Sequence, residues 1–117
     1  MNQKTLWLKR REVLMHFDRY DAIHHGCVRF GDNEGEWHQG RKMFFASVAV
    51  KAKDEFWTEI RSGNMRFRAD MLIFKHDTGT ADIVEFADSE SDESLERKRS
   101  YWEGKGFTFI IVKKEVG

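Results

Sequence analysis

The spacing of apolar residues changes twice along the second half of the chain. From Met65 to Phe74 and again from Ala81 to Ala87, apolar and polar residues tend to alternate, which is typical of half-buried strands. Over residues 95–102 the spacing becomes helical, and residues 107–112 form a strand-like apolar run. The segment 75–80 has the composition of a hairpin turn. The pattern therefore predicts strand, hairpin, strand, helix and strand.

The first half of the chain adds two predicted helices and one strand. Helical spacing predicts one helix from Thr5 to Ile23 and another over residues 36–50. Residues 54–61 alternate and predict a strand that ends at the turn of residues 62–64. Its predicted faces carry Phe56, Thr58 and Ile60 on one side and Trp57, Glu59 and Arg61 on the other. From residue 36 onward, helix, three strands, helix and strand predict an α/β fold, with a mixed sheet of about four strands flanked by helices.

Length and composition are those of one domain, residues 1–117. With 40% hydrophobic residues, including ten Phe, the chain is long enough to bury a core. We divide it into an N-terminal helical extension, residues 1–30, and a core, residues 34–113. The single Cys27 excludes an internal disulfide and is typical of a reducing compartment. We find neither a signal peptide nor an apolar run near the roughly 20 residues of a membrane span, so we expect a cytoplasmic, intracellular protein without a membrane partner.

The charges are unevenly distributed along the chain although its formal net charge is +0. Residues 1–76 hold 14 lysines and arginines against 10 acids, a net charge of +4. Residues 77–117 hold 6 against 10, a net charge of −4. A basic half favours a polyanionic partner such as DNA, and an acidic half would require cations before such a partner approached it.

Two acidic residues, Asp70 and Glu85, lie inside the second and third predicted strands. Strict alternation places Arg66, Arg68, Asp70 and Leu72 on one face, with Phe67, Ala69, Met71 and Ile73 opposite. If the strands pair across the hairpin, the two carboxylates are neighbours, and a divalent cation would relieve their repulsion. Water bound to such a metal can hydrolyse a phosphodiester. An ion pair of Asp70 with Arg66 or Arg68 is the alternative.

Two other groups of residues admit more than one interpretation. His24, His25, Cys27 and His38 suggest zinc, but their spacing matches no paired-ligand pattern, so ordinary loop or strand histidines are favoured. The helix predicted at Thr5–Ile23 is basic on its outer faces. We interpret it as a surface helix packed by one stripe, with a DNA-binding arm or a dimer element as the alternative.

A series of short motifs follows the predicted order of elements over residues 34–113. They are Glu36-Trp-His, Lys42, Trp57-Thr-Glu59, Arg68-Ala-Asp70, Val84-Glu85-Phe, Arg97 with Tyr101, and Gly106-Phe. This arrangement resembles the PD-(D/E)XK nuclease superfamily, in particular its competence protein CoiA-like branch and small viral or resolvase-type nucleases. The resemblance implies a restriction-endonuclease-like core and leaves the N-terminal helix outside it.

The resemblance also implies roles for individual residues. Asp70 and Glu85 correspond to the metal-binding acids of the family, and Glu36, with Glu34 as the fallback, corresponds to the acid of the first core helix. The metal would be Mg²⁺ or Mn²⁺. The lysine that the family places two residues after the Glu is replaced here by Ala87. We expect a relocated lysine instead, with Lys98 as the first and Lys42 as the second candidate catalytic residue.

The sequence therefore predicts a metal-dependent DNA endonuclease. Its expected phosphate contacts are Arg66, Arg68, Arg97 and Arg99, with Tyr101 packing its helix and touching DNA. A domain this small has no room for a separate recognition module, so cleavage should be selective for structure, as in nicking or in Holliday junction resolution. We expect a homodimer, whose two active sites on one two-fold axis would cut two strands, and a virus or mobile element would be a compatible source. The alternative is a catalytically inactive DNA-binding protein of the same fold.

Overall fold

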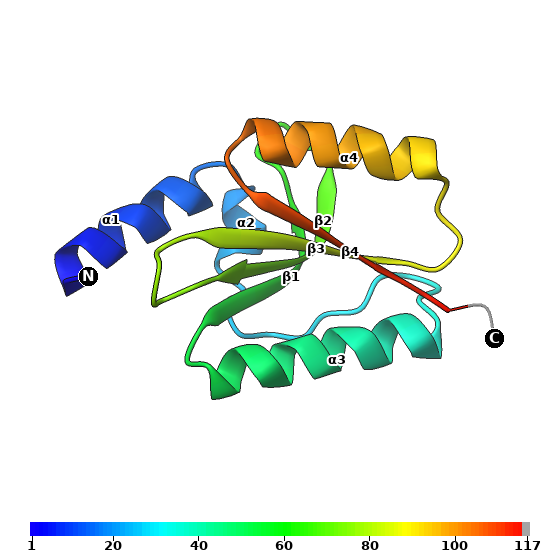
Figure 1. The fold of residues 1–117 in the computed structure, drawn as a ribbon, viewed down its shortest axis with the longest axis horizontal. Coiled ribbons are helices and arrows are strands. Elements are labelled where there is room, and N and C mark those ends of the chain that lie inside the picture. Colours follow the sequence, from blue (N-terminus) through cyan, green and yellow to red (C-terminus); the bar gives the residue numbers. More distant parts are fainter. Residues whose placement is uncertain (116–117) are drawn as a thin grey trace.

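The computed structural model of the chain describes residues 1–115, in which helices cover both faces of a single sheet (Figure 1). The helices are α1 (Gln3–Leu14), α2 (Arg19–Ala22), α3 (Glu36–Lys51) and α4 (Asp92–Gly104). The strands are β1 (Glu55–Arg61), β2 (Arg68–Phe74), β3 (Ala81–Ala87) and β4 (Thr108–Lys113). None of the helices in this described part is long and apolar enough to cross a membrane.

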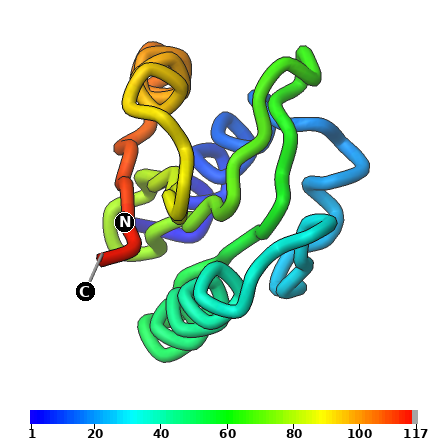
Figure 2. Tube along the Cα trace, turned by 90° about the vertical axis from the view of Figure 1, so that its right-hand side faces the viewer, coloured from blue at the N-terminus to red at the C-terminus, as the bar shows by residue number. Residues whose placement is uncertain are grey.

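The sheet has the strand order β1-β2-β3-β4. β1 pairs with β2 and β2 with β3 in the antiparallel sense, whereas β3 pairs with β4 in parallel through the α4 crossover. Figure 2 shows α3 and α4 on opposite sides of the strands. The element order from residue 36 and the mixed α/β sheet are therefore confirmed.

Local signals set several of these boundaries. The Ser91 hydroxyl accepts a hydrogen bond from the Ser94 backbone N–H at 3.2 Å, which caps the start of α4. Asp92 in the first turn of α4 stabilises the helix because its negative charge is attracted to the positive end of the helix dipole. The hairpin between β2 and β3 turns at Gly79, whose φ of 70° lies in the left-handed region that glycine adopts without strain.

Two apolar clusters fill the space between the sheet and its helices. The first lies under α1 and α4 and is built largely of aromatic rings, among them Phe17, Trp57, Phe74, Trp102 and Phe109. The second lies under α3 and has fewer aromatic rings; it contains Ala46, Ala49, Phe56, Met71, Ile73, Val84 and Phe86. The two clusters hold the sheet between α3 on one face and α1 with α4 on the other.

The prediction of one helix over Thr5–Ile23 is wrong. α1 ends at Leu14, and α2 begins only at Arg19. Between them Phe17 is 3% exposed, packs in the first cluster and forms an isolated bridge with Ser62 beside β1. The backbone N–H of Asp18 bonds to the Arg61 carbonyl oxygen at 2.9 Å, so the chain is tied to the sheet where a continuous helix would leave it.

The predicted strict alternation of side chains between the two faces of the sheet is also wrong at one place in β1 and the neighbouring place in β2. In β1, Trp57 and Ile60 both pack in the first cluster, because Glu59 between them has a φ of 51° and shifts the alternation. In β2, Ala69 shares the first cluster with Leu72, although alternation predicts that they lie on opposite faces. β2 also begins at Arg68, three residues later than predicted. Glu59 and Asp70 lie at the position across the two strands where the alternation breaks.

Candidate functional site

Three acidic residues lie in one row across neighbouring strands. Glu59 of β1 falls opposite Asp70 of β2, between the partners Thr58↔Met71 and Ile60↔Ala69. Continuing the β2–β3 register one step beyond Met71↔Val84 brings Asp70 opposite Glu85. The predicted proximity of Asp70 and Glu85 therefore agrees with the register.

The side chains of Asp70 and Glu85 accept backbone hydrogen bonds where the backbone pairing of β2 with β3 ends. The ladder ends at Met71↔Val84, although both strands continue. The Asp70 backbone N–H donates to Glu85 Oε2 at 2.9 Å, and the Phe86 backbone N–H donates to Asp70 Oδ2 at 2.9 Å. Each side chain thus satisfies a backbone donor that a continuous ladder would have used.

Glu85 is 1% exposed and lies beside Lys98 of α4. Lys98 Nζ is 3.0 Å from Glu85 Oε1 and 2.8 Å from Glu90 Oε2. Burial and the adjacent Asp70 charge raise the pKa of Glu85 to about 8. Burial alone would lower the pKa of Lys98, but Glu85 and Glu90 together raise it, so Lys98 stays charged.

His38 of α3 approaches the same row from the other side. Its Nε2 atom is 3.3 Å from Asp70 Oδ2 and 3.4 Å from Glu34 Oε1. The contact with Asp70 raises the pKa of His38 although burial opposes this. Burial would raise the pKa of Asp70, but His38, Glu85 and the Phe86 N–H together hold it below its usual value.

Lys42 is 0% exposed and lies between Glu34 and Glu59 of the row of acids. Its Nζ atom donates to Glu34 Oε1 at 2.6 Å and to the Arg29 carbonyl oxygen at 3.0 Å, and it lies 3.7 Å from Glu59 Oε1. Burial raises the pKa of Glu59. A buried ammonium with carboxylate partners on two sides meets the requirement that buried charges be paired.

We call these residues the carboxylate cluster. They are Glu34, His38, Lys42, Glu59, Asp70, Glu85 and Lys98. Four of the seven buried side-chain polar atoms that lack a hydrogen bond within residues 1–115 belong to it: Glu34 Oε2, His38 Nε2, Glu59 Oε2 and Glu85 Oε1. Some of these atoms approach charges, but without hydrogen-bond geometry. Such a concentration of unused polar atoms is typical of a site that receives a ligand or an ion.

The structure separates the predicted site residues into two groups. Asp70, Glu85, Lys98 and Lys42 come together in the carboxylate cluster. Glu36 does not: it is exposed in the first turn of α3, and no side-chain hydrogen bond or ion pair of the described residues involves it. The fallback Glu34 takes that place, since it contacts His38 and Lys42.

Two members of the cluster were missed by the sequence analysis. Glu59 and His38 both lie within the short motifs named above, but the sequence assigns neither of them a role in the nuclease site, and His38 is otherwise named only as a zinc candidate. The signal for His38 is its spacing of four residues from Lys42 within α3, which places these two side chains on the same side of the helix. No comparable signal existed for Glu59, because its direction depends on the positive φ.

The residues predicted to contact DNA lie around the start of β2 and along α4. Arg66 and Arg97 are exposed, and neither side chain has an ion-pair partner within the described residues. Arg68 is exposed and lies 3.4 Å from Glu59. Arg99 is half-buried, 3.6 Å from Glu96. Tyr101 stacks on Phe67 with ring centroids 4.3 Å apart, so the predicted packing role is present.

The zinc candidates do not assemble. His25 Nε2 is 3.2 Å from Glu55 Oε1, and His38 belongs to the carboxylate cluster. Over residues 1–115, no three His, Cys, Asp or Glu side chains are arranged so that they could hold a metal ion. That finding also applies to the carboxylate cluster as it stands, where Lys98 and His38 provide the positive charge next to the acids.

The carboxylate cluster nevertheless contains oxygen atoms of the chemical type that a hard divalent cation binds. Asp70 Oδ1 takes part in none of the hydrogen bonds or ion pairs of the described residues, and Glu34 Oε2 and Glu85 Oε1 are buried without hydrogen bonds. These are carboxylate oxygens, which Mg²⁺ and Mn²⁺ prefer. The residues are therefore compatible with such an ion.

Comparisons with known proteins returned no match of any kind. No family model matches the chain, and neither a curated protein nor a solved structure does. We therefore infer function from the geometry and chemistry of the carboxylate cluster.

Proposed function

We propose that this protein is a divalent-metal-dependent DNA endonuclease with a restriction-endonuclease-like core. The observation that carries the proposal is the junction of β2 and β3, where Asp70 and Glu85 replace the backbone ladder and Lys98 Nζ lies 3.0 Å from Glu85 Oε1. Two carboxylates can hold a divalent cation, and a charged lysine beside them can stabilise negative charge on a phosphate, so this arrangement supports metal-assisted phosphodiester hydrolysis. The order of helices and strands supports the same family of folds.

Asp70 and Glu85 would hold the metal, with Glu34 as the third acid in place of Glu36. When bound, Mg²⁺ or Mn²⁺ would supply a nucleophilic water and neutralise charge on the phosphate. Because burial and Asp70 raise the pKa of Glu85 to about 8, Glu85 would have to lose its proton first. Metal binding should accordingly strengthen as the pH rises toward 8.

Lys98 would provide the function of the lysine that is missing at Ala87. Its ammonium stays charged and projects from α4 toward Glu85 of β3 and Glu90 of the loop before α4. From there it would orient the attacking oxygen and stabilise negative charge on the phosphate in the transition state. Lys42 is less suited to this role because it is fully buried between Glu34 and Glu59.

His38 would act beside Asp70 as a group that holds or releases a proton. Its ring lies between Asp70 and Glu34, and the contact with Asp70 raises its pKa, which favours the charged imidazolium. A charged His38 balances the two acids in the absence of a metal. A divalent cation held by Asp70 would take over this balancing charge, so His38 would then lose its proton to solvent more readily.

Exposed arginines would position the DNA without reading its sequence. Arg66 and Arg97 lack ion-pair partners in the described part of the chain, and the Phe67–Tyr101 stack joins their two elements. Contacts of this kind bind phosphates. We therefore propose selectivity for nicked or branched DNA, including Holliday junctions, rather than for a sequence.

The test is cleavage of linear duplex, nicked, single-stranded, flap and four-way-junction DNA with Mg²⁺, Mn²⁺ or EDTA. Wild type is compared with Asp70→Asn, Lys98→Met and the matched control Asp77→Asn, which changes an exposed acid in the same hairpin. We expect metal-dependent cleavage by wild type and by Asp77→Asn, and a loss of at least about 100-fold in the other two.

Absence of cleavage on every substrate would contradict the proposal. If wild type and Asp70→Asn then bound DNA equally well, the inactive DNA-binding protein would be the correct reading, and Ala87 would mark a lost catalytic lysine. Equal cleavage by wild type and Asp70→Asn would instead indicate a contaminating nuclease.

A further inference from the structure

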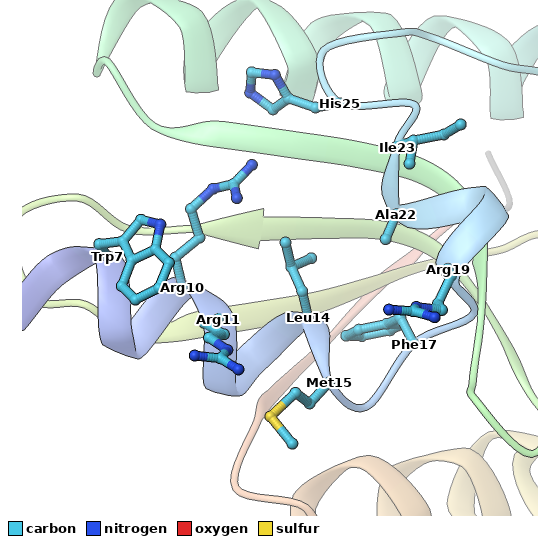
Figure 3. A pocket seen from close by; sticks show the side chains of 10 residues that line it. All are labelled: Trp7, Arg10, Arg11, Leu14, Met15, Phe17, Arg19, Ala22, Ile23 and His25. Carbon is cyan, nitrogen blue, oxygen red and sulfur yellow. The ribbon is translucent and has the colours of Figure 1, made fainter.

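A concave site lies between α1 and α2, apart from the carboxylate cluster. It is a cavity of about 870 Å³, and no residue of the carboxylate cluster lines it. Figure 3 shows Trp7 and Arg10 of α1 on one side, Arg19 and Ile23 around α2 on the other, and Leu14 between them. Its volume is within the range of sites that hold small ligands.

The positive charge of this cavity is not balanced by acids on its wall. No Asp or Glu lines it, although three arginines do. Arg10 is held by Glu55 outside the lining, with its Nε atom 2.9 Å from Glu55 Oε2. Arg11 and Arg19 have no ion-pair partner among residues 1–115. The cavity therefore offers two unpaired guanidinium groups to an anion.

The acids nearest to Arg19 in the sequence are already engaged elsewhere. Asp21 accepts hydrogen bonds from the Arg61 backbone N–H and from Arg61 Nε, both at 2.9 Å. Asp18 lies 3.7 Å from Arg61 Nη2 and caps α2 by accepting from the Asp21 backbone N–H. Because Arg61 takes up both acids, Arg19 remains available to a ligand.

The rest of the cavity is apolar and aromatic. Trp7 is 55% exposed at its edge, and the Arg11 guanidinium lies 5.6 Å from the centre of the Trp7 ring. Leu14 and the buried Phe17 contribute apolar surface between the two helices. A flat ring with an attached phosphate matches this combination, because aromatic and guanidinium planes stack on bases and arginine binds phosphate.

We propose that the cavity between α1 and α2 binds an unpaired nucleotide of a single-stranded DNA segment. Arg11 and Arg19 would contact its phosphates, and Trp7 would stack on its base. In a duplex the base faces are already stacked, so the cavity selects single strands. The choice of DNA rests on the proposed nuclease function, to which this site would add a preference for substrates with an unpaired strand.

The test measures binding in EDTA, so that cleavage plays no part. The probes are fluorescein-labelled oligothymidylate, a duplex of the same length, and thymidine monophosphate and polyglutamate as competitors. We expect oligothymidylate to bind more tightly than duplex and to be displaced by thymidine monophosphate in preference to polyglutamate of equal charge. Tight binding of duplex, or equal displacement by polyglutamate, would overturn the proposal.

Two variants locate the binding in the cavity. The double variant Arg11→Glu with Arg19→Glu should weaken oligothymidylate binding at least roughly tenfold. It should also reduce the magnitude of the slope of log binding constant against log salt concentration by about 1.4, since each of two phosphate contacts to a single strand contributes about 0.7. The matched control, Arg41→Glu with Lys51→Glu, makes the same charge change on α3, outside the cavity. Equal effects of the two double variants would overturn the proposal.

A third variant separates stacking from charge. Trp7→Ala, at an exposed position, should lower the affinity for oligothymidylate roughly tenfold without changing the salt slope. Unchanged affinity would refute stacking at this site. The same measurements with Asp70→Asn keep the two proposals distinct, because strand binding in the cavity should persist even if the protein cuts no DNA at all.

Discussion

At the scale of single residues, the environment of Glu85 couples the candidate chemistry to the pH. Its carboxyl is buried beside Asp70, and both effects raise its pKa to about 8. In the unfolded chain the same group has its ordinary pKa of 4.5. Between these two values the folded protein therefore holds a proton on Glu85 that the unfolded chain has lost.

We predict from this that the free energy of unfolding falls as the pH rises from 5 to 8. The contribution of Glu85 reaches up to about 1.4 kcal/mol per pH unit, and the raised pKa of His38 acts in the same direction above 6.5. Glu85→Gln stays neutral and should give a flatter pH profile. Urea denaturation at successive pH values measures this, with Glu36→Gln as control; parallel profiles for wild type and Glu85→Gln would contradict it.

A second prediction distinguishes the two acids at the start of α3. Glu34→Gln should raise the Mg²⁺ concentration required for half-maximal DNA cleavage by roughly 10- to 100-fold, because Glu34 lies in the carboxylate cluster. Glu36→Gln should leave that concentration unchanged, since Glu36 is exposed and has no side-chain partner in residues 1–115. The reverse result would restore the assignment of Glu36 by resemblance.

At the scale of elements, hydrophobic periodicity predicts the bounds of a helix or strand wherever that element follows one regular period. It predicted α3 within one residue and β3 at both ends. It failed at Phe17, whose position in a helical stripe is compatible both with a continuous helix and with a break that inserts the ring into the core. Only the contact with β1 decides between the two, and no local pattern contains that information.

The break at Phe17 leads to a prediction about stability. Phe17→Ala should lower the free energy of unfolding by about 3–5 kcal/mol, because the ring is buried and stacks on Trp102 with centroids 5.2 Å apart. Met15→Ala, two residues away and exposed, should change it by no more than about 0.5 kcal/mol. Urea denaturation of both variants tests this, and a loss for Phe17→Ala as small as that for Met15→Ala would mean that the Phe17 ring faces solvent rather than the core.

The candidate site was predictable in part for a related reason. Asp70 and Glu85 lie at equal distances from the hairpin turn, so their proximity follows from antiparallel pairing alone. The position of Lys98 depends on how α4 is rotated over the sheet, and that of Glu34 depends on the loop before α3. Spacing cannot supply either orientation, which explains why Lys98 was only one of two candidates and Glu34 only a fallback.

At the scale of the whole molecule, the prediction of a homodimer concerns surfaces rather than single contacts. The outer side of α3 exposes Met43, Phe44 and Val48, which is apolar area that a second chain could cover. We expect light scattering to give twice the single-chain mass of 13.9 kDa, and Phe44→Lys to return it to the single value. A mass of one chain at all concentrations would exclude the dimer.

The hydrogen bonds from two backbone amides to the carboxylates of Glu85 and Asp70 have a consequence for NMR spectroscopy. The amide protons of Asp70 and Phe86 are bonded to acceptors whose charge changes on protonation, whereas their neighbours in the ladder are bonded to carbonyl groups that do not titrate. Their NMR resonances should therefore shift with the pH or with an added ion while the Met71 and Val84 resonances stay nearly constant. These two amides are intrinsic probes of the site, which report its occupancy without a label or a substrate.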